Sequence, residues 1–443
     1  MEIQLSDHFT YKKILRFTLP SIGMLLFTSI YGVVDGFFVS NLVGKSAFAS
    51  LNLIMPFLQI ISGMGAMFGV GGSALVAKTL GEGDSRRAGR YFTMMIYLLL
   101  IVGAVTSALG IIFIRPVSYL LGATEAMIED CVIYGRIYLF FNIAMHAQYT
   151  FQSYLIVAEK PQLGLYVTVA AGLTNVVADV LFMAVFPMGI AGAALATGLS
   201  QCVGGLIPAL WFLSKKNRSP LRFRKTGMEL RPLVRSCANG ASEMLTAVSG
   251  SITGMLVNLQ LMRCDPVNGV AAYGVVMYAA WIFVAIFMGF CSGIAPVMSY
   301  HYGAENHGEM QNILKKCLTI LLVGGTALTG IALLLSYPIS LAFVGYDATL
   351  MDITVRAFFL CALSFLVMGI NVYTSSLFTS LNNGAVSAAA SFFRSLLFPA
   401  LAILILPTIF GLSGVWYAMI TSETLGMVVS VGFLIGKRKK YHY

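Results

Sequence analysis

The chain has 443 residues, of which 58% are hydrophobic and only 10% charged. Soluble domains carry about 25% charged residues, so this composition excludes a soluble globular protein and indicates one that crosses a membrane many times. The net charge of +10 would suit a nucleic-acid partner, but the basic residues gather in the links between apolar segments. There they face anionic lipid, and we expect no nucleic-acid binding.

Apolar segments long enough to cross a bilayer, about 20 residues or more, follow one another along the whole chain. The stretch from Met1 to Arg16 is polar and basic, and the apolar run after it is too long for a cleavable signal, so we expect the first segment to be kept. Runs of this length also exclude the alternating strands of a barrel. We predict twelve transmembrane helices, at residues 14–40, 50–78, 91–114, 129–157, 162–186, 190–213, 236–261, 270–300, 314–336, 350–380, 385–408 and 411–436.

The basic residues predict the orientation of these segments. Of the 28 Lys and Arg, 22 fall on the side that receives both termini and every second link. The other side holds Lys45, Arg115 and Arg263, and the remaining three lie in or near segments. Basic loops stay in the cytoplasm, so we expect both termini to be cytoplasmic.

A weak repeat divides the chain at its most basic link, Lys215 to Arg235. The run Gly71 to Gly81 matches Gly293 to Gly303, and Gly189-Ile-Ala-Gly192 matches Gly411-Leu-Ser-Gly414. Six segments return the chain to its starting side, so two such halves form parallel repeats, and the substrate site of such transporters lies between them. We predict an all-α polytopic membrane protein of two pseudo-symmetric six-helix lobes: residues 1–213 and 236–436, a basic linker at 214–235 and a basic tail at 437–443.

Two acidic residues interrupt apolar segments of the first half. Asp35 lies about nineteen residues into the first segment and Asp179 about seventeen into the fifth, and both segments start on the cytoplasmic side. Their depths are therefore similar, and both belong to one half. An ionisable residue inside a membrane is costly and marks a functional site by default. Two carboxylates in one cavity cannot easily both ionise, which favours binding of a proton or Na⁺.

Two neutral polar residues are candidates to complete a cation site with these acids. Asn175 precedes Asp179 by four residues and shares its helical face. Thr197 stands in the sixth segment, which follows the fifth through the short link Phe186-Pro187-Met188-Gly189. The alternative is that Asp179 serves as a structural hydrogen-bonding group without an ion.

Pro20 lies in the same segment as Asp35. A proline inside a helix removes a backbone hydrogen bond and usually kinks the helix. It is either a bending point that responds to Asp35 or one of the prolines that membrane helices tolerate.

The second half carries its own polar residues inside apolar segments. Glu243 and Glu423 could bind a cationic substrate or a second ion, or could pair with an interior base. Arg394 is the candidate partner for one of these acids, although the sequence does not say which. Asn258 is one of several polar residues in the seventh segment.

His146 and Gln148 make the fourth segment polar on part of its surface. A lone histidine in a span relays protons in some proteins, but more often it is a packing residue. No spacing typical of a metal site and no catalytic cluster occurs, so we expect no cofactor and no enzymatic activity.

Together these motifs resemble the multidrug and toxic compound extrusion (MATE) family of cation-coupled exporters, over essentially the whole chain. The resemblance rests on the twelve segments, on Pro20 followed by Val34-Asp35-Gly-Phe-Phe-Val39, and on Gly71 to Asp84. Asn175-x-x-x-Asp179 and the run Gly189 to Thr197 complete it.

The resemblance implies a V-shaped pair of lobes that alternate between inward-open and outward-open states. It implies that Asp35, Asn175, Asp179 and Thr197 form the cation site. One branch of the family uses acids in the seventh and tenth segments for Na⁺. Glu243 matches the first of these, but the tenth segment has only Asp352 near its outer end.

We therefore expect a secondary antiporter that confers drug resistance by exporting organic cations or amphipathic compounds in exchange for H⁺ or Na⁺. It is expected to work as a monomer in the plasma (inner) membrane of a prokaryote. The alternative is a lipid-linked oligosaccharide flippase of the same superfamily, which needs several cationic groups for a pyrophosphate. The interior arginines are limited to Arg136, Arg356 and Arg394.

Overall fold

A computed structural model describes residues 3–215 and 217–443, with the backbone alone for residues 40, 41, 45 and 46. Residue 216 of the predicted linker and the side chain of Lys45 thus lie outside the described residues. The described part of the chain is helical and contains no strand. The N-terminal half consists of α1 (Tyr11–Phe38), η1 (Val39–Val43), α2 (Lys45–Gly81), α3 (Ser85–Leu120), α4 (Ile128–Phe140), α5 (Asn142–Val157), α6 (Pro161–Asp179), η2 (Val180–Val185) and α7 (Gly189–Leu213).

The C-terminal half also consists of long helices, one of which is interrupted by a π-helical turn. It consists of α8 (Leu230–Cys264), α9 (Asn268–Gly303), α10 (His307–Val344), α11 (Ala348–Ser380), α12 (Gly384–Phe392), η3 (Phe393–Leu397), α13 (Phe398–Phe410) and α14 (Leu412–Tyr441). Among the described residues, eleven helical stretches are long and apolar enough to cross a membrane. The fourth predicted segment is not among them, because it is broken at Phe141 into the shorter α4 and α5.

Equivalent capping residues begin equivalent helices in the two halves. Asp84 accepts a hydrogen bond from the backbone N–H of Arg87 at the start of α3, and Asn306 accepts one from Glu309 at the start of α10. Such side chains satisfy the free N–H groups of a first helical turn. Asp84 and Asn306 lie 222 residues apart, as do Gly81 and Gly303, which end the preceding helices.

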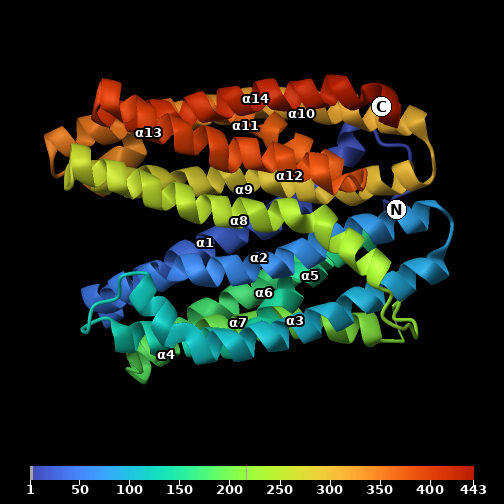
Figure 1. Ribbon diagram of the computed structural model, residues 1–443, viewed down its shortest axis with the longest axis horizontal. Helices are drawn as coiled ribbons and strands as arrows, with labels where there is room; N and C mark the ends of the chain where they lie inside the picture. The colour runs from blue at the N-terminus through green and yellow to red at the C-terminus, as the bar shows by residue number, and fades with distance from the viewer. Residues whose placement is uncertain (1–2, 216) are drawn as a thin grey trace.

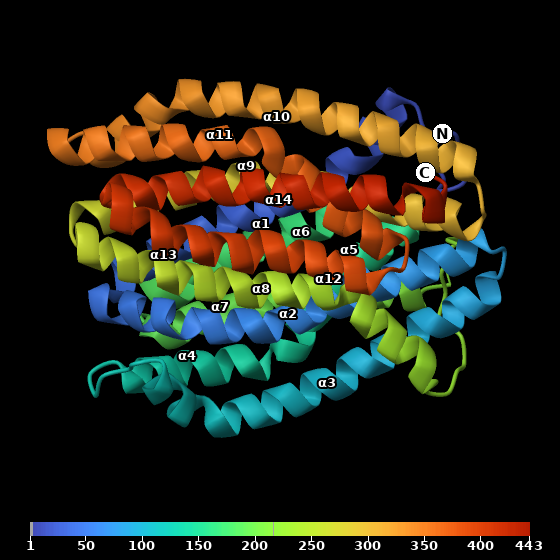
Figure 2. The ribbon, with the colours of Figure 1, turned by 45° about the horizontal axis from the view of Figure 1, so that its top comes forward.

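The two halves lie side by side as two groups of roughly parallel helices (Figure 1). In the turned view, α10 and α11 form one edge of the molecule and α3 and α4 the opposite edge (Figure 2). The contacts between the halves are made mainly by the first two long helices of each. α1 packs on α9, and α2 packs on α8 and α9. These four helices form the core of the interface between the halves.

Glycines bring the helices of this interface into backbone contact at the end that carries both termini. A Cβ atom on Gly71 would overlap the carbonyl oxygen of Ser236, and one on Gly240 would overlap that of Met67. Likewise, Cβ atoms on Gly81 and Gly303 would overlap the carbonyl oxygens of Tyr300 and Lys78. Only glycine permits helices to approach this closely.

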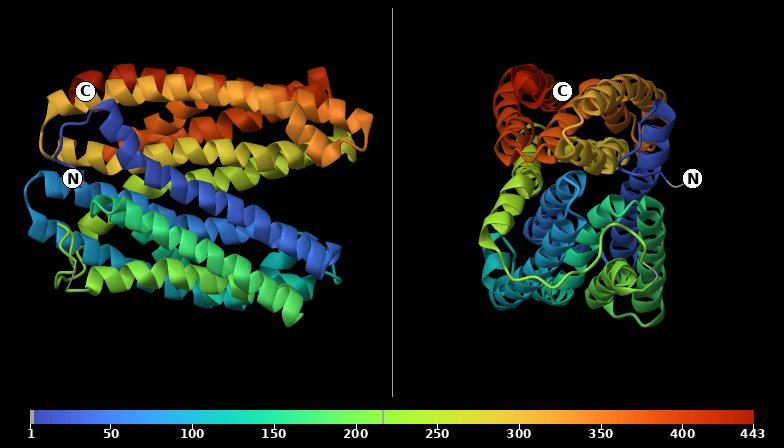
Figure 3. Two further views of the ribbon diagram at one scale, coloured as in Figure 1. Left: turned by 180° about the vertical axis from the view of Figure 1, so that it is seen from behind. Right: turned by 90° about the vertical axis from the view of Figure 1, so that its right-hand side faces the viewer.

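The halves separate toward the opposite end of the molecule (Figure 3, left). Gly32 lies in the last third of α1, and Gly250 and Gly254 lie beyond the middle of α8. A Cβ atom added at any of these three would meet no described atom within 4 Å. The interface is therefore closed at the termini end and open at the other.

A short segment before α1 ties the two halves together at the closed end. The N–H of Leu5 donates to Glu159 Oε1 of the N-terminal half at 2.8 Å. The N–H of Phe9 donates to Glu309 Oε1 of α10 at 2.8 Å, and Lys316 Nζ donates to the Phe9 carbonyl oxygen at 2.7 Å. Leu5 and Phe9 are buried, so this segment adds both polar and apolar contacts across the interface.

The residues predicted to form a basic linker and a basic tail are partly helical and pack against neighbouring helices. Leu221 of the linker is buried, and the N–H of Arg224 donates to Thr93 Oγ1 on α3 at 2.9 Å. α8 begins at Leu230, within the predicted linker. The last helix runs on to Tyr441, whose hydroxyl accepts a hydrogen bond from Asn383 at 2.7 Å. Apolar and aromatic residues among the charges dock both segments onto neighbouring helices.

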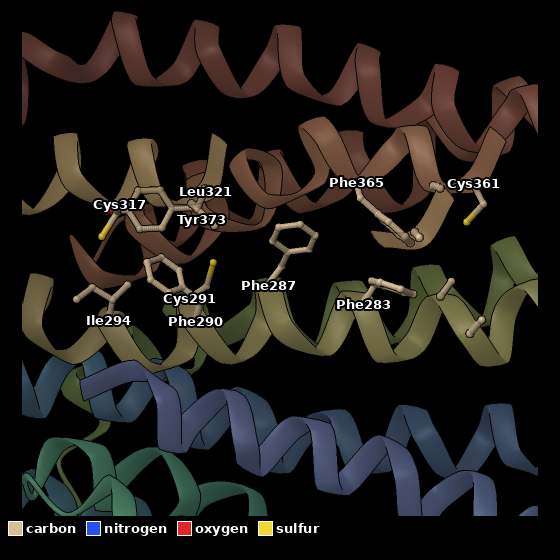
Figure 4. Packing of buried hydrophobic residues seen from close by; sticks show 14 of the residues in the cluster. Phe283, Phe287, Phe290, Cys291, Ile294, Cys317, Leu321, Cys361, Phe365 and Tyr373 are labelled. Carbon is tan, nitrogen blue, oxygen red and sulfur yellow. The ribbon is translucent and has the colours of Figure 1, made fainter. Parts of the chain in front are cut away.

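Aromatic packing holds the C-terminal half together. Phe283, Phe287 and Phe290 project from α9 toward Phe365 and Tyr373 of α11 (Figure 4). The rings of Phe283 and Phe365 stack with centroids 5.1 Å apart. This core fixes α9, which forms the interface, to α11.

We predict that Gly81→Ala destabilises the protein, because the new methyl group would overlap the Tyr300 carbonyl oxygen. Overpacking of this kind costs roughly 1–3 kcal/mol and should lower the thermal unfolding midpoint of the purified protein by several degrees.

Gly250→Ala is the matched control, because its Cβ would meet no described atom within 4 Å. Alanine in a helix interior is favoured over glycine by about 0.5–1 kcal/mol, so this midpoint should stay level or rise. Equal midpoints for the two variants would contradict the closed interface at Gly81.

Candidate cation site

Two carboxylates face each other inside the N-terminal half. Asp35 lies in the last turn of α1, and Asp179 is the last residue of α6. The two helices pack along one another, with Gly172 of α6 against the ring of Tyr31. Asp179 is fully buried and Asp35 half-buried. The carboxyl groups approach closely enough to share a hydrogen bond when one of them carries a proton.

The oxygen atoms at this point lack hydrogen-bond donors. Neither carboxylate oxygen of Asp179 is hydrogen-bonded to any described residue, and the same holds for Oδ1 of Asp35. Buried polar atoms in proteins are nearly always hydrogen-bonded, so a group of exceptions calls for an explanation. Two ionised carboxylates with no donor between them repel each other, and a bound proton or metal cation removes that cost.

Asn175 lies on α6, which also carries Asp179, and Thr197 lies on the neighbouring α7. Asn175 is buried one turn before Asp179 in α6, and its Oδ1 is another buried oxygen with no donor among the described residues. Thr197 stands in α7, which packs along α6. Its Oγ1 is buried and likewise has no described partner. The predicted four residues thus come from three adjacent helices.

A group of side chains that the sequence analysis did not single out completes the surroundings. Tyr134 of α4 lies beside Thr197 and within electrostatic range of both carboxylates. Tyr138, one turn further on, lies near Asp35 and next to Gln201 of α7. Their regular i, i+4 spacing on a helix face could have identified the tyrosines. Only the packing of α4 against α7 brings Gln201 to the site.

Both acids stand next to a π-helical turn. η1 begins four residues after Asp35, and η2 begins directly after Asp179. A π-helical turn widens the helix and frees backbone groups from their usual partners, and such turns occur frequently at functional sites. Here they interrupt the two helices that carry the carboxylates, at the level of the site.

The arrangement fits a small cation. Carboxylate, amide and hydroxyl oxygens are the ligands that hard cations take in proteins. In the part of the chain that the structure describes, no group of three or more His, Cys, Asp or Glu residues is placed to hold a metal ion. A proton shared by the two carboxylates, or a hard cation such as Na⁺ bound to them, would satisfy their oxygens.

Pro20 is buried in α1, and the helix runs through it. It lies between Thr18 and Ser21, against which Gly293 of α9 packs, with a Cβ on Gly293 meeting Ser21 Oγ at 3.1 Å. The proline therefore sits in the part of α1 that contacts the other half, fifteen residues before Asp35.

The C-terminal half pairs its acid with a base. Arg394 Nε donates to both carboxylate oxygens of Glu423, at 3.1 and 3.2 Å, and Asn371 Nδ2 donates to Oε2 at 2.7 Å. The partner that the sequence left open for Arg394 is therefore Glu423. Glu243 of α8 is half-buried and within electrostatic range of Arg394.

Of the other polar candidates, Asn258 and His146 lie apart from these clusters, and Gln148 lies at the edge of one. Asn258 is exposed on α8. His146 is buried on α5, with Nε2 2.9 Å from the Ile61 carbonyl oxygen and its ring edge-on to Phe68, which indicates a packing role. Gln148 lies beside Tyr31 of α1 and thus at the margin of the Asp35 site.

Comparison with known proteins agrees with this architecture. The MatE family model matches the chain twice, over residues 20–181 and 244–404. The multidrug export protein MepA of Staphylococcus saprophyticus is 22% identical over 426 residues, covering 94% of this chain and 91% of that protein. MepA of Staphylococcus aureus (strain MSSA476) is 22% identical over 419 residues with the same coverage.

Solved structures share the fold. A MATE protein in its straight conformation has a TM-score of 0.90 at 23% identity, covering 98% of this chain and 97% of that one. A multidrug resistance MATE family transporter of the MOP superfamily, in its outward-facing conformation, has a TM-score of 0.91 at 21% identity, covering 98% and 97%. Because the family model matches most of its length, in two copies, the chain belongs to the MatE family of multidrug efflux transporters.

Proposed function

We propose that the protein is a secondary antiporter that exports organic cations or amphipathic compounds in exchange for H⁺ or Na⁺. The observation that carries this proposal is the pair of facing carboxylates, Asp35 and Asp179, whose buried oxygens lack donors among the described residues. With Asn175 and Thr197 they form the coupling site. The MepA relatives, which are named multidrug export proteins, support the choice of cargo.

The proposal includes a topology. α4 and α5 together form a twelfth span, and residues 1–213 and 236–436 form two lobes joined by the linker. The termini end, which carries the basic segments, faces the cytoplasm of a prokaryotic cell, as the positive-inside pattern indicates. The open end then faces outward, so the structure is in an outward-open state. The protein works as a monomer within one membrane.

The geometry supports a route from cation binding to the closed interface. Asp35 and Pro20 lie on one helix, and the stretch around Pro20 packs against Gly289 and Gly293 of α9. A cation that enters from the open end removes the repulsion between Asp35 and Asp179 and draws α1 toward α6. A proline lacks the N–H of an intact helix and offers the bending point for that movement. The movement then loosens or tightens the contact with α9.

Exchange follows from differential binding. A ligand shifts a conformational equilibrium only by as much as its affinities for the two states differ. If the cation stabilises one position of α1 and the exported compound stabilises the other, each promotes release of the other. The inward gradient of the cation then drives export.

A lipid-linked oligosaccharide flippase is not favoured. Arg136 and Arg356 are exposed, and the guanidinium of Arg356 pairs with Asp352 at 3.0 Å. Arg394 pairs with Glu423. A pyrophosphate would need several free cationic groups inside the molecule, and the three interior candidates do not supply them.

We predict that Asp179→Asn reduces export driven by an imposed pH or Na⁺ gradient to the background of empty proteoliposomes, because the amide cannot take up the coupling cation. Export of a fluorescent organic cation from proteoliposomes measures this.

Thr174→Val is the matched control on the same helix, because among the described residues the Thr174 hydroxyl donates only to the Ala170 carbonyl oxygen of its own helix. It should transport at close to the wild-type rate. Undiminished export by Asp179→Asn, under either gradient, would refute the proposed coupling site.

We also predict the orientation. In a variant whose seven native cysteines are replaced by serine, a single cysteine in place of Glu125, in the α3–α4 link, should react with an impermeant thiol reagent added to intact cells. One in place of Lys439 should react only after the cells are opened. The reverse pattern would place the termini outside and contradict the proposed topology.

A further inference from the structure

The C-terminal half contains a cavity of about 250 Å³. Its walls come from α8, α9, α11, α13 and α14, and they are mostly apolar. The charged side chain in its lining is Glu423. Cavities that bind small organic molecules have this character, with apolar and aromatic walls and a few polar groups that fix orientation.

This cavity occupies the position in its half that the cation site occupies in the other. The cation site draws its residues from α1, α4, α6 and α7, which belong to the first, fourth, fifth and sixth predicted segments of the N-terminal half. The cavity is lined by α8, α11, α13 and α14, which belong to the same four segments of the C-terminal half, and also by α9 of the second segment. Each half also has a π-helical turn in its fifth segment. In the N-terminal half this turn, η2, directly follows Asp179, and in the C-terminal half the turn η3 contains Arg394.

The charges of the two positions differ. The cation site holds two acids that face each other without a base. In the C-terminal half, Arg394 and Asn371 satisfy Glu423, and Glu243 lies within electrostatic range of the same guanidinium. This cluster has two acidic residues for one guanidinium. A positively charged ligand would contact Glu423, which lines the cavity, in competition with Arg394.

The apolar walls suit an aromatic ligand. Tyr273 and Trp281 of α9 and Phe365 of α11 line the cavity, together with Met277 and Met419. Aromatic faces attract organic cations, and methionine side chains adapt to ligands of different shape. Both features suit a protein that handles more than one compound.

We propose that this cavity is a binding site for the exported compound, separate from the cation site, and that it takes aromatic monocations whose charge lies beside Glu423. This inference rests on the proposed function for its cargo. On this inference the two halves bind different ligands. Asp35 and Asp179 bind the coupling ion, and the compound binds between α9, α11 and α14.

The test uses the fluorescence of Trp281 in the full-length purified protein. The chain has 3 tryptophans, so Trp211→Phe with Trp416→Phe leaves Trp281 as the reporter. The probe is N-benzylpyridinium, an aromatic monocation whose pyridinium ring quenches tryptophan. Diphenylmethane has the same shape without the charge and serves as a competitor. We expect saturable quenching by the cation, and displacement by diphenylmethane only at a concentration roughly tenfold higher or more.

Variants separate the cavity from the rest of the molecule. Glu423→Gln should weaken probe binding at least about tenfold, and Arg394→Gln should strengthen it, because the competing guanidinium is gone. Ala280→Leu places a larger side chain in the cavity and leaves Arg394 and Glu423 unchanged. It should also weaken probe binding, and it provides the test if Glu423→Gln fails to fold. Glu125→Gln removes an acid from a distant loop and should leave binding unchanged.

Asp179→Asn distinguishes this inference from the proposed coupling. If the cavity binds the compound, this variant keeps the quenching of Trp281 while it loses gradient-driven export. Quenching that does not saturate, that survives both Glu423→Gln and Ala280→Leu, or that is lost in Asp179→Asn would overturn the inference. Wild-type protein that binds the probe in this way but exports nothing would refute the antiport and leave the cavity site standing.

Discussion

Electrostatic repulsion between Asp35 and Asp179 is the constraint on which the proposed mechanism depends, because neither oxygen of Asp179 nor Oδ1 of Asp35 has a donor among the described residues. An ionised carboxylate at this depth is expensive, and a second one facing it makes the cost greater. The side-chain oxygens of Asn175, Thr197 and Gln201 are of the kind that hard cations take as ligands. A bound proton or metal cation would remove the repulsion, which is why we assign the coupling site to this half.

The position of α1 explains how binding of a cation at Asp35 would affect the contact between the halves. α1 carries Asp35 near one end and packs against the glycines of α9 near the other. At the closed end the halves meet through backbone contacts at Gly71, Gly81 and their counterparts, and the segment around Phe9 adds hydrogen bonds to α10. Contacts this close have little room to deform gradually, so a shift of α1 is expected to switch the interface between distinct packings. In the C-terminal half Glu423 is already paired with Arg394, which is why we assign the cargo to that half.

Much of this could be read from the sequence, and the exceptions have physical causes. The lengths of the apolar runs predicted eleven of the spans, and the rarity of acids in them singled out Asp35 and Asp179 as candidates for one cavity. The break at Phe141 was not predictable, because no proline or glycine stands at or next to this position. Tyr134 and Tyr138 were not singled out although their i, i+4 spacing was visible, because aromatic residues are common in spans. Gln201 could not be selected without the packing of α4 against α7. The partner of Arg394 also depended on packing, since Glu243 and Glu423 were equal candidates until α11, α14 and η3 were placed together.

The central claim is that Asp35 and Asp179 share the coupling cation, and infrared difference spectroscopy of the purified protein tests it most directly. On lowering the pH, the account predicts a carboxylic acid C=O band that disappears in both Asp35→Asn and Asp179→Asn, because each variant removes one member of the pair. If Na⁺ is the coupling ion, adding it to the wild-type protein should convert that band into carboxylate bands. A spectrum in which neither variant changes any carboxyl band, under pH or Na⁺ change, would contradict the account.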